Sequence, residues 1–156
     1  MRFLYRITFV SVLLTTAVDT TACDCILTGV KEAVKRADAV LLGTVISVKD
    51  LEIVPVDVLT HFPLYVRRVE LIVDRAFKGR MVSDTVVVYT AVEGTECGFD
   101  FRLGLSYIVY GDRDTSFDSR QVSSDEPLYG RGIYWTSICT RTRLYDEAEV
   151  KGIDAL

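Results

Sequence analysis

The sequence predicts a mainly β fold: a five-stranded Greek-key barrel of the OB type, with a short N-terminal helix and a C-terminal helix. Three observations favour this fold. The apolar segments are short and rich in β-branched residues, Gly43 interrupts the first of them, and helical periodicity is confined to the two ends. A glycine inside a strand is typical of a bulge or bend, which lets a strand curl around a barrel. With 156 residues, 49% of them hydrophobic, and no repeat or linker, we expect one domain.

The first elements follow one another closely. Residues 30–37 predict a helix whose apolar side chains share one face: Val30, Ala33, Val34 and Ala37. Thr28 precedes this helix as a candidate capping residue. Residues 39–48 are small, apolar and β-branched and predict the first strand. Residues 49–63 mix charges with two prolines, so we expect a loop or an extended hairpin arm there.

Four further segments predict the rest of the sheet: 65–77, 85–90, 105–110 and 130–138. The first of them alternates, which places every second side chain on one face: Tyr65, Arg67, Val69, Leu71, Val73, Arg75 and Phe77. Residues 112–129 are polar and without a period, and they predict a long surface loop. Residues 145–156 predict a closing helix, with Asp146 and Glu147 at the end where carboxylates stabilise the helix dipole.

The first 22 residues have the layout of a secretory signal peptide. Arg2 and Arg6 precede an apolar run over 7–14, and small residues end at Ala22. The run is much shorter than the roughly 20 apolar residues of a membrane-spanning helix. We therefore expect cleavage after Ala22, a secreted mature domain over 23–156, and no stable membrane insertion.

A bacterial lipoprotein is the alternative, since lipidation acts on a cysteine directly after the cleavage site, here Cys23. The protein would then be periplasmic or lipid-anchored. Thr20 disfavours this alternative, because lipidation signals usually carry a Leu-like residue at that position.

Net charge argues against a nucleic-acid partner. The chain has a net charge of −4, and removing Arg2, Arg6 and Asp19 takes away one net positive charge, which leaves −5. A negative domain is repelled by phosphate backbones. OB-type barrels bind single strands on aromatic platforms, but here we expect core packing of the candidate aromatic residues: Tyr65, Phe77, Tyr89, Tyr107 and Tyr110.

Enzymatic activity is not expected. His61 is the only histidine and lies near prolines, so neither a histidine-rich metal site nor a Ser/His/Asp triad can be assembled. The carboxylate pairs Asp112 with Asp114 and Asp125 with Glu126 lie in a polar segment without a calcium-loop pattern. We expect no cofactor and no metal bound by the isolated domain.

All four cysteines lie in the predicted mature domain: Cys23, Cys25, Cys97 and Cys139. An even number in an exported domain predicts two disulfides, for which three pairings exist.

The predicted mature chain opens with Cys23-Asp24-Cys25, and further motifs follow in order: Ala37-Asp38, Phe77-Lys78-Gly79, Val88-Tyr89-Thr90-Ala91, Cys97-Gly98, Gly104 with Tyr107, and Cys139 before the last helix. This series resembles the tissue inhibitors of metalloproteinases, a netrin-like family, in a single-domain form. Lys35 stands where that family has a cysteine, and no cysteine follows Cys139, so both members of the family's third bridge are absent together.

The resemblance implies disulfides Cys23–Cys97 and Cys25–Cys139 and a monomeric inhibitor whose partner is a zinc metalloproteinase. The free amine and carbonyl oxygen of Cys23 would chelate the catalytic zinc, which keeps one coordination position open. The implied inhibitory ridge comprises Asp24, Cys25, Ile26, Thr95, Glu96, Cys97 and Gly98. In the family the side chain at position 24 enters the target's specificity pocket, so an acidic residue favours a target with a basic or polar group there.

The alternative is a secreted netrin-like module that binds another extracellular or cell-surface partner without contacting zinc, because a fold does not determine a function. Tyr134 and Trp135 would then form a contact patch, unless they are buried in the core.

Overall fold

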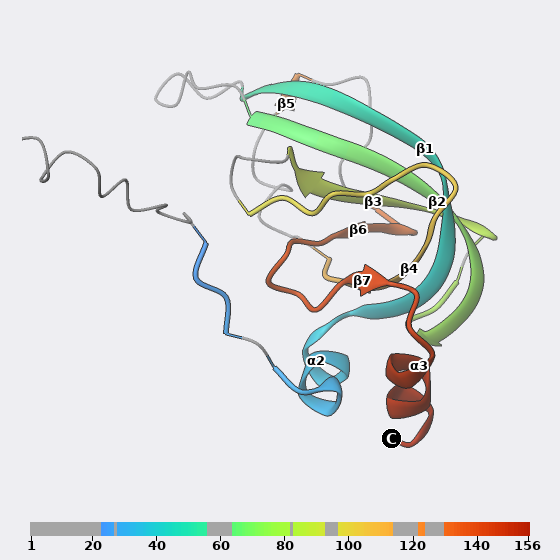
Figure 1. Cartoon of the computed structure of the whole chain (residues 1–156). Helices are drawn as coiled ribbons and strands as arrows, with labels where there is room; N and C mark the ends of the chain where they lie inside the picture. Colours follow the sequence, from blue (N-terminus) through green and yellow to red (C-terminus); the bar gives the residue numbers. More distant parts are fainter. Residues whose placement is uncertain are drawn as a thin grey trace, which may run out of the picture.

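The computed structural model describes residues 23–26, 28–55, 64–81, 83–92, 97–113, 122–123 and 130–156. They form a mainly β, curled half-barrel sheet, with a short helix before the sheet and a second helix at the C-terminal end (Figure 1). The predicted fold class is confirmed at this level. The predicted signal peptide lies outside the described residues, and so do several candidate residues: His61, Thr95, Glu96, Asp114, Asp125 and Glu126.

The elements follow in the order α2 (Val30–Arg36), β1 (Ala39–Pro55), β2 (Leu64–Lys78), β3 (Thr85–Ala91), β4 (Ser106–Gly111), β5 (Val122–Ser123), β6 (Ile133–Trp135), β7 (Arg143–Leu144) and α3 (Glu147–Asp154). Six strands lie in the order β6-β3-β2-β1-β4-β7, and β5 pairs with β1 off this path. All neighbours are antiparallel except β3 and β6, which are parallel. An isolated bridge joins Asp112, after β4, to Trp135 in β6, so the sheet curls until two non-adjacent strands touch.

The predicted number of strands was wrong. The described residues hold seven strands rather than five, and three of them have only two or three residues. The strand predicted over 130–138 is reduced to β6, because Gly130 and Gly132 have positive φ angles and form a turn before it. The segment predicted as the loop 112–129 contains β5, which pairs with the end of β1.

The first strand is longer than predicted. Residues 49–63 were expected to be a loop or an extended hairpin arm, and the second alternative holds for 49–53: they continue β1 in unbroken register with β2, from Lys49 opposite Arg68 to Ile53 opposite Leu64. The charged residues favour this pairing, because Arg67 donates hydrogen bonds of 2.7 and 3.2 Å across the ladder to the Asp50 carboxylate. Arg67 accordingly holds the pKa of Asp50 below its usual value.

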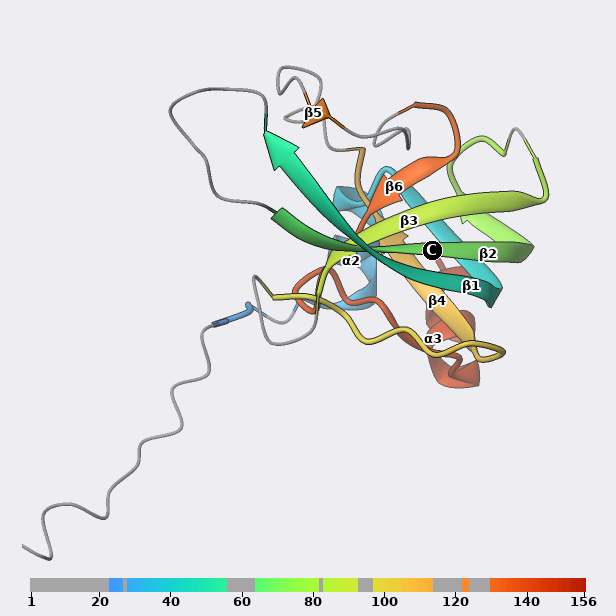
Figure 2. The same ribbon diagram turned by 90° about the horizontal axis from the view of Figure 1, so that it is seen from above.

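Gly43 has the predicted role in bending β1. The register with β2 shifts between Leu42 and Gly43, and again at two other points along β1. A Cβ atom at position 43 would lie 2.6 Å from the carbonyl oxygen of Ile72, which no side chain could tolerate without a backbone shift. Glycine therefore lets β1 and β2 curl together (Figure 2).

The two helices pack side by side against one end of the sheet (Figure 1). The predicted face of α2 is confirmed, since Ala33 and Ala37 are buried beside Ile153 of α3. The predicted cap was wrong: Gly29 is the N-cap of α2, with no side-chain cap hydrogen bond. Helix α3 is capped by Asp146, whose carboxylate accepts a 3.0 Å hydrogen bond from the Ala148 amide.

The aromatic residues lie mostly where they were predicted. Tyr89, Tyr107 and Tyr110 are buried, and Phe77 is packed at the edge of the helix-covered core. Tyr65 is 51% exposed, so the prediction that it packs in the core was wrong. It lies opposite Glu52 near the start of β2, whereas Val69 and Leu71, further along the strand, are buried.

Candidate functional site

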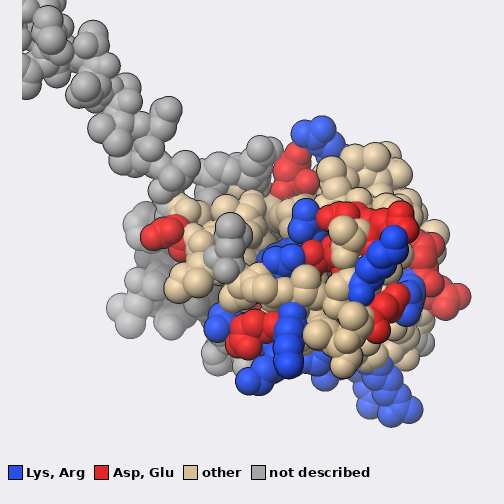
Figure 3. Space-filling view, turned by 60° about the horizontal axis from the view of Figure 1, so that its bottom comes forward, with Lys and Arg blue, Asp and Glu red and all other residues tan. Residues whose placement is uncertain are grey.

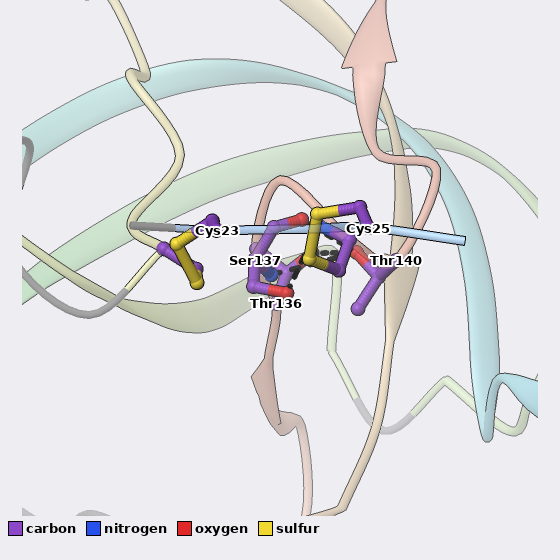
Figure 4. The surroundings of a disulfide bond; sticks show 7 residues. Cys23, Cys25, Thr136, Ser137 and Thr140 are labelled. Carbon is purple, nitrogen blue, oxygen red and sulfur yellow. Dashed lines mark hydrogen bonds between the residues drawn. A yellow bond between two sulfur atoms is a disulfide. The ribbon is translucent and has the colours of Figure 1, made fainter. Parts of the chain in front are cut away.

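The candidate site is the segment 23–26, which two disulfides hold to the rest of the domain. Cys23 is bonded to Cys97 and Cys25 to Cys139, the pairing that the resemblance implies (Figure 4). No described cysteine is left unpaired. Because the two bridges alternate with Asp24 and Ile26, the segment is fixed at every second residue. Asp24 is exposed and Ile26 is 85% exposed.

The sheet topology explains why both anchors lie together. Strands β3 and β6 are parallel, so their C-terminal ends lie at the same end of the sheet. Cys97 follows β3 and Cys139 follows β6. The two following loops are joined directly, because the Ile138 amide donates a 3.1 Å hydrogen bond to the carbonyl oxygen of Cys97. The segment 23–26 is thereby held against two loops at once.

The turn that carries Cys139 is fixed by buried threonine hydroxyls. The Thr136 hydroxyl oxygen lies 2.6 Å from that of Thr142 and 2.7 Å from that of Thr140. The Thr136 amide also donates to the carbonyl oxygen of Tyr89 at 2.9 Å. Figure 4 shows Thr136, Ser137 and Thr140 near the Cys25 disulfide. The anchor of Cys25 is therefore rigid by hydrogen bonding as well as by its covalent bond.

Gly98 is required by the close approach of its backbone to β3. A Cβ atom there would lie 2.1 Å from the carbonyl oxygen of Ala91. The preceding residue, Cys97, has a φ of 58°, and the following amide of Phe99 donates a 2.9 Å hydrogen bond to the Thr90 hydroxyl. The conformation of the loop that anchors Cys23 thus depends on a glycine at this position.

Replacing Gly98 with alanine is expected to lower the free energy of unfolding by about 1–3 kcal/mol, the usual cost of forcing extra atoms into a packed site. Urea unfolding of the variant and the parent measures this difference. Gly29→Ser is the matched control, because a Cβ atom at position 29 meets nothing within 4 Å and serine caps helices well. Equal stability of the Gly98→Ala variant and the parent would contradict the predicted clash.

A buried charge network holds the chain just after the candidate segment. Arg141 donates a 2.8 Å hydrogen bond to the carbonyl oxygen of Thr28. The same guanidinium forms two 2.6 Å hydrogen bonds to Glu149 of α3, which is only 3% exposed. Tyr110 donates a 2.5 Å hydrogen bond to this carboxylate. The network therefore connects the C-terminal helix, the sheet and the start of the chain.

Burial alone would raise the pKa of Glu149, but hydrogen bonds from Arg141 and Tyr110 outweigh it and hold the pKa below its usual value. Burial and the neighbouring carboxylate raise the pKa of Tyr110. Glu149 is consequently ionised and Tyr110 neutral at pH 7. Neither side chain is exposed, so we assign this network a structural role.

The remaining sequence-predicted residues are placed as follows. Tyr134 is 1% exposed and supplies no part of the contact patch of the alternative hypothesis, whereas Trp135 is half-buried and stacks on Tyr89 with the ring centroids 5.1 Å apart. Thr95 and Glu96 of the implied ridge lie outside the described residues. Within the described part of the chain, no group of three or more His, Cys, Asp or Glu side chains could hold a metal ion.

Neither the threonine cluster nor the Arg141 network was predicted from the sequence. A sequence signal existed for the first, since Thr136, Thr140 and Thr142 surround Cys139 in a short segment. The ion pair between Arg141 and Glu149 had no such signal, because it depends on how α3 folds back. No helix among the described residues is long and apolar enough to span a membrane.

These features define a class of structure: a curled half-barrel β domain with an N-terminal segment held by two disulfides. No protein-family model matches the sequence, and no curated protein matches it.

Proposed function

We propose that the chain is an exported inhibitor of zinc metalloproteinases, built on an OB-type barrel and starting at Cys23 after removal of residues 1–22. The observation that carries this proposal is the double anchoring of the segment 23–26, with Asp24 exposed between the two anchored cysteines and Ile26 exposed directly after them. The resemblance to tissue inhibitors of metalloproteinases supports the same function.

The chemistry requires a free amino terminus. The amine nitrogen and carbonyl oxygen of Cys23 form a five-membered chelate with the zinc and displace the water from its open coordination position. The two disulfides favour binding, because an already ordered segment loses little conformational entropy when it enters a cleft. The exposed carboxylate of Asp24 favours a target whose specificity pocket carries a basic or polar group, since burial of an unpaired charge is costly.

The test compares a form that starts at Cys23 with a form that has one extra alanine before it, against zinc proteases with apolar and with basic specificity pockets. We expect the first form to inhibit at least the basic-pocket proteases and the extended form to lose inhibition, because the chelating amine is displaced. Near-ultraviolet circular dichroism and the midpoint of thermal unfolding check that both forms keep the same fold.

Two outcomes oppose the proposal. Equal inhibition by the two forms would exclude chelation by the terminal amine. Absence of inhibition by both, with the fold intact, would favour the alternative of a secreted module that binds another extracellular partner.

A further inference from the structure

The arginines of the described residues fall into two groups. Most form ion pairs with carboxylates: Arg36, Arg67, Arg68, Arg75, Arg102, Arg141 and Arg143. Figure 3 shows this mixing of charges, with blue and red side chains next to one another on the face in view. The other three, Arg80, Arg113 and Arg131, are exposed and form no ion pair with any described carboxylate.

These three arginines line the same pocket, together with Met81 and Gly132. The pocket has a volume of about 370 Å³, which lies within the range of small-molecule sites. None of the described residues that line the pocket carries a carboxylate. In a chain with more acidic than basic residues, the arginines that lack an acidic partner among the described residues are thus gathered in one place.

The pocket is built by three separate segments with fixed backbones. Arg80 follows β2, Arg113 follows β4 and Arg131 precedes β6. The Arg113 amide donates a 2.7 Å hydrogen bond to the carboxylate of Asp38, so this acid binds the main chain rather than the guanidinium. The carbonyl oxygen of Gly132 accepts a 2.9 Å hydrogen bond from the Val87 amide. The fold therefore brings three arginines to one pocket although like charges repel.

We propose that this pocket binds a small ligand that carries a phosphate or sulfate group. A guanidinium is planar and presents paired N–H donors that match the oxygens of such groups. One oxyanion between the three arginines would neutralise their mutual repulsion. The side chain of Met81 and the aliphatic parts of the arginines offer apolar contacts to the rest of the ligand.

The pocket is separate from the segment 23–26. Gly132 contacts Val87 near the start of β3, whereas Gly98 lies against Ala91 at its end. Val87 and Ala91 are four residues apart along this strand, which corresponds to about 13 Å. The turn between β2 and β3 and the segment 23–26 lie on opposite sides of the molecule in both views (Figure 1, Figure 2). The proposal therefore does not depend on protease inhibition.

Isothermal titration with inorganic phosphate and with sulfate, each against chloride at equal ionic strength, tests the proposal on the mature domain. We expect saturable binding, weakened about tenfold by Arg80→Ala, Arg113→Ala or Arg131→Ala, because each removes a hydrogen bond between charged groups. The matched control is Arg36→Ala, which removes the same charge from an exposed position on α2 and should leave binding unchanged.

A second comparison identifies the preferred anion. Inorganic phosphate takes up a proton and loses its second negative charge as the pH falls from 7.5 to 5.5, whereas sulfate keeps both charges. Binding that weakens over this range only for phosphate therefore indicates a site for the doubly charged group. The proposal is overturned if neither anion binds beyond the chloride reference, or if the three pocket variants bind as tightly as the Arg36→Ala control.

Discussion

Removing the Cys25–Cys139 disulfide by replacing both cysteines with alanine is expected to lower the free energy of unfolding by about 4 kcal/mol. The bridge joins residues 114 positions apart. With Cys23–Cys97 still present, the loop it closes in the unfolded chain is shorter: two residues from 23 to 25 plus 42 residues from 97 to 139. A loop of this length corresponds to about 4 kcal/mol in the chain-entropy treatment.

The other bridge provides a matched control. When Cys23 and Cys97 are replaced instead, the loop closed by the lost bridge runs through the same two stretches of chain, although this bridge spans only 74 positions. The two double variants are therefore expected to agree within about 0.5 kcal/mol, apart from any local strain. Urea unfolding under non-reducing conditions measures both. A cost below about 1 kcal/mol for either variant would contradict the entropic argument.

Local patterns in the sequence were sufficient to predict the broad fold class. The interruption at Gly43, the apolar face of α2 and the carboxylates before α3 each depend on neighbours within a few residues, and the structure has each of them. The extension of β1 to Pro55 could be predicted only as one of two alternatives, because the charged residues Lys49, Asp50 and Glu52 lie opposite residues of β2 that are distant in the sequence. The strands β5, β6 and β7 are too short to produce a period of their own and are defined by the strands they join.

The candidate site was predictable only in part. The number of cysteines predicts two bridges, but the placement of Cys97 beside Cys139 depends on the parallel pairing of β3 with β6, which nothing in the local sequence indicates. The pocket arginines come from three distant segments and had no shared motif. The same reason applies to Arg141, whose partners Thr28 and Glu149 lie far from each other in the sequence.

Arg141→Met is expected to lower the free energy of unfolding by about 3 kcal/mol at pH 7. The substitution leaves the carboxylate of Glu149 buried without its main cationic partner, and loss of one member of a buried ion pair is strongly destabilising. Adding Glu149→Gln should recover much of this loss, because glutamine removes the charge and keeps an oxygen that accepts the Tyr110 hydrogen bond. The exposed pair of Arg36 with Glu32 is the control, since Arg36→Met should cost only a few tenths of a kcal/mol.

The free energy of unfolding at acid pH is the sharper test. Lowering the pH should destabilise the parent but stabilise the Arg141→Met variant. In the parent, the pKa of Glu149 is held below its usual value of about 4.3, so its stabilisation is present above that pH and is lost as the pH falls through the lower folded value. In Arg141→Met, burial is no longer outweighed and should raise the pKa of Glu149, so protonation stabilises the folded variant. The difference between parent and variant should therefore shrink as the pH falls from 7 to 4. A constant difference would show that packing, rather than the ion pair, accounts for the role of Arg141.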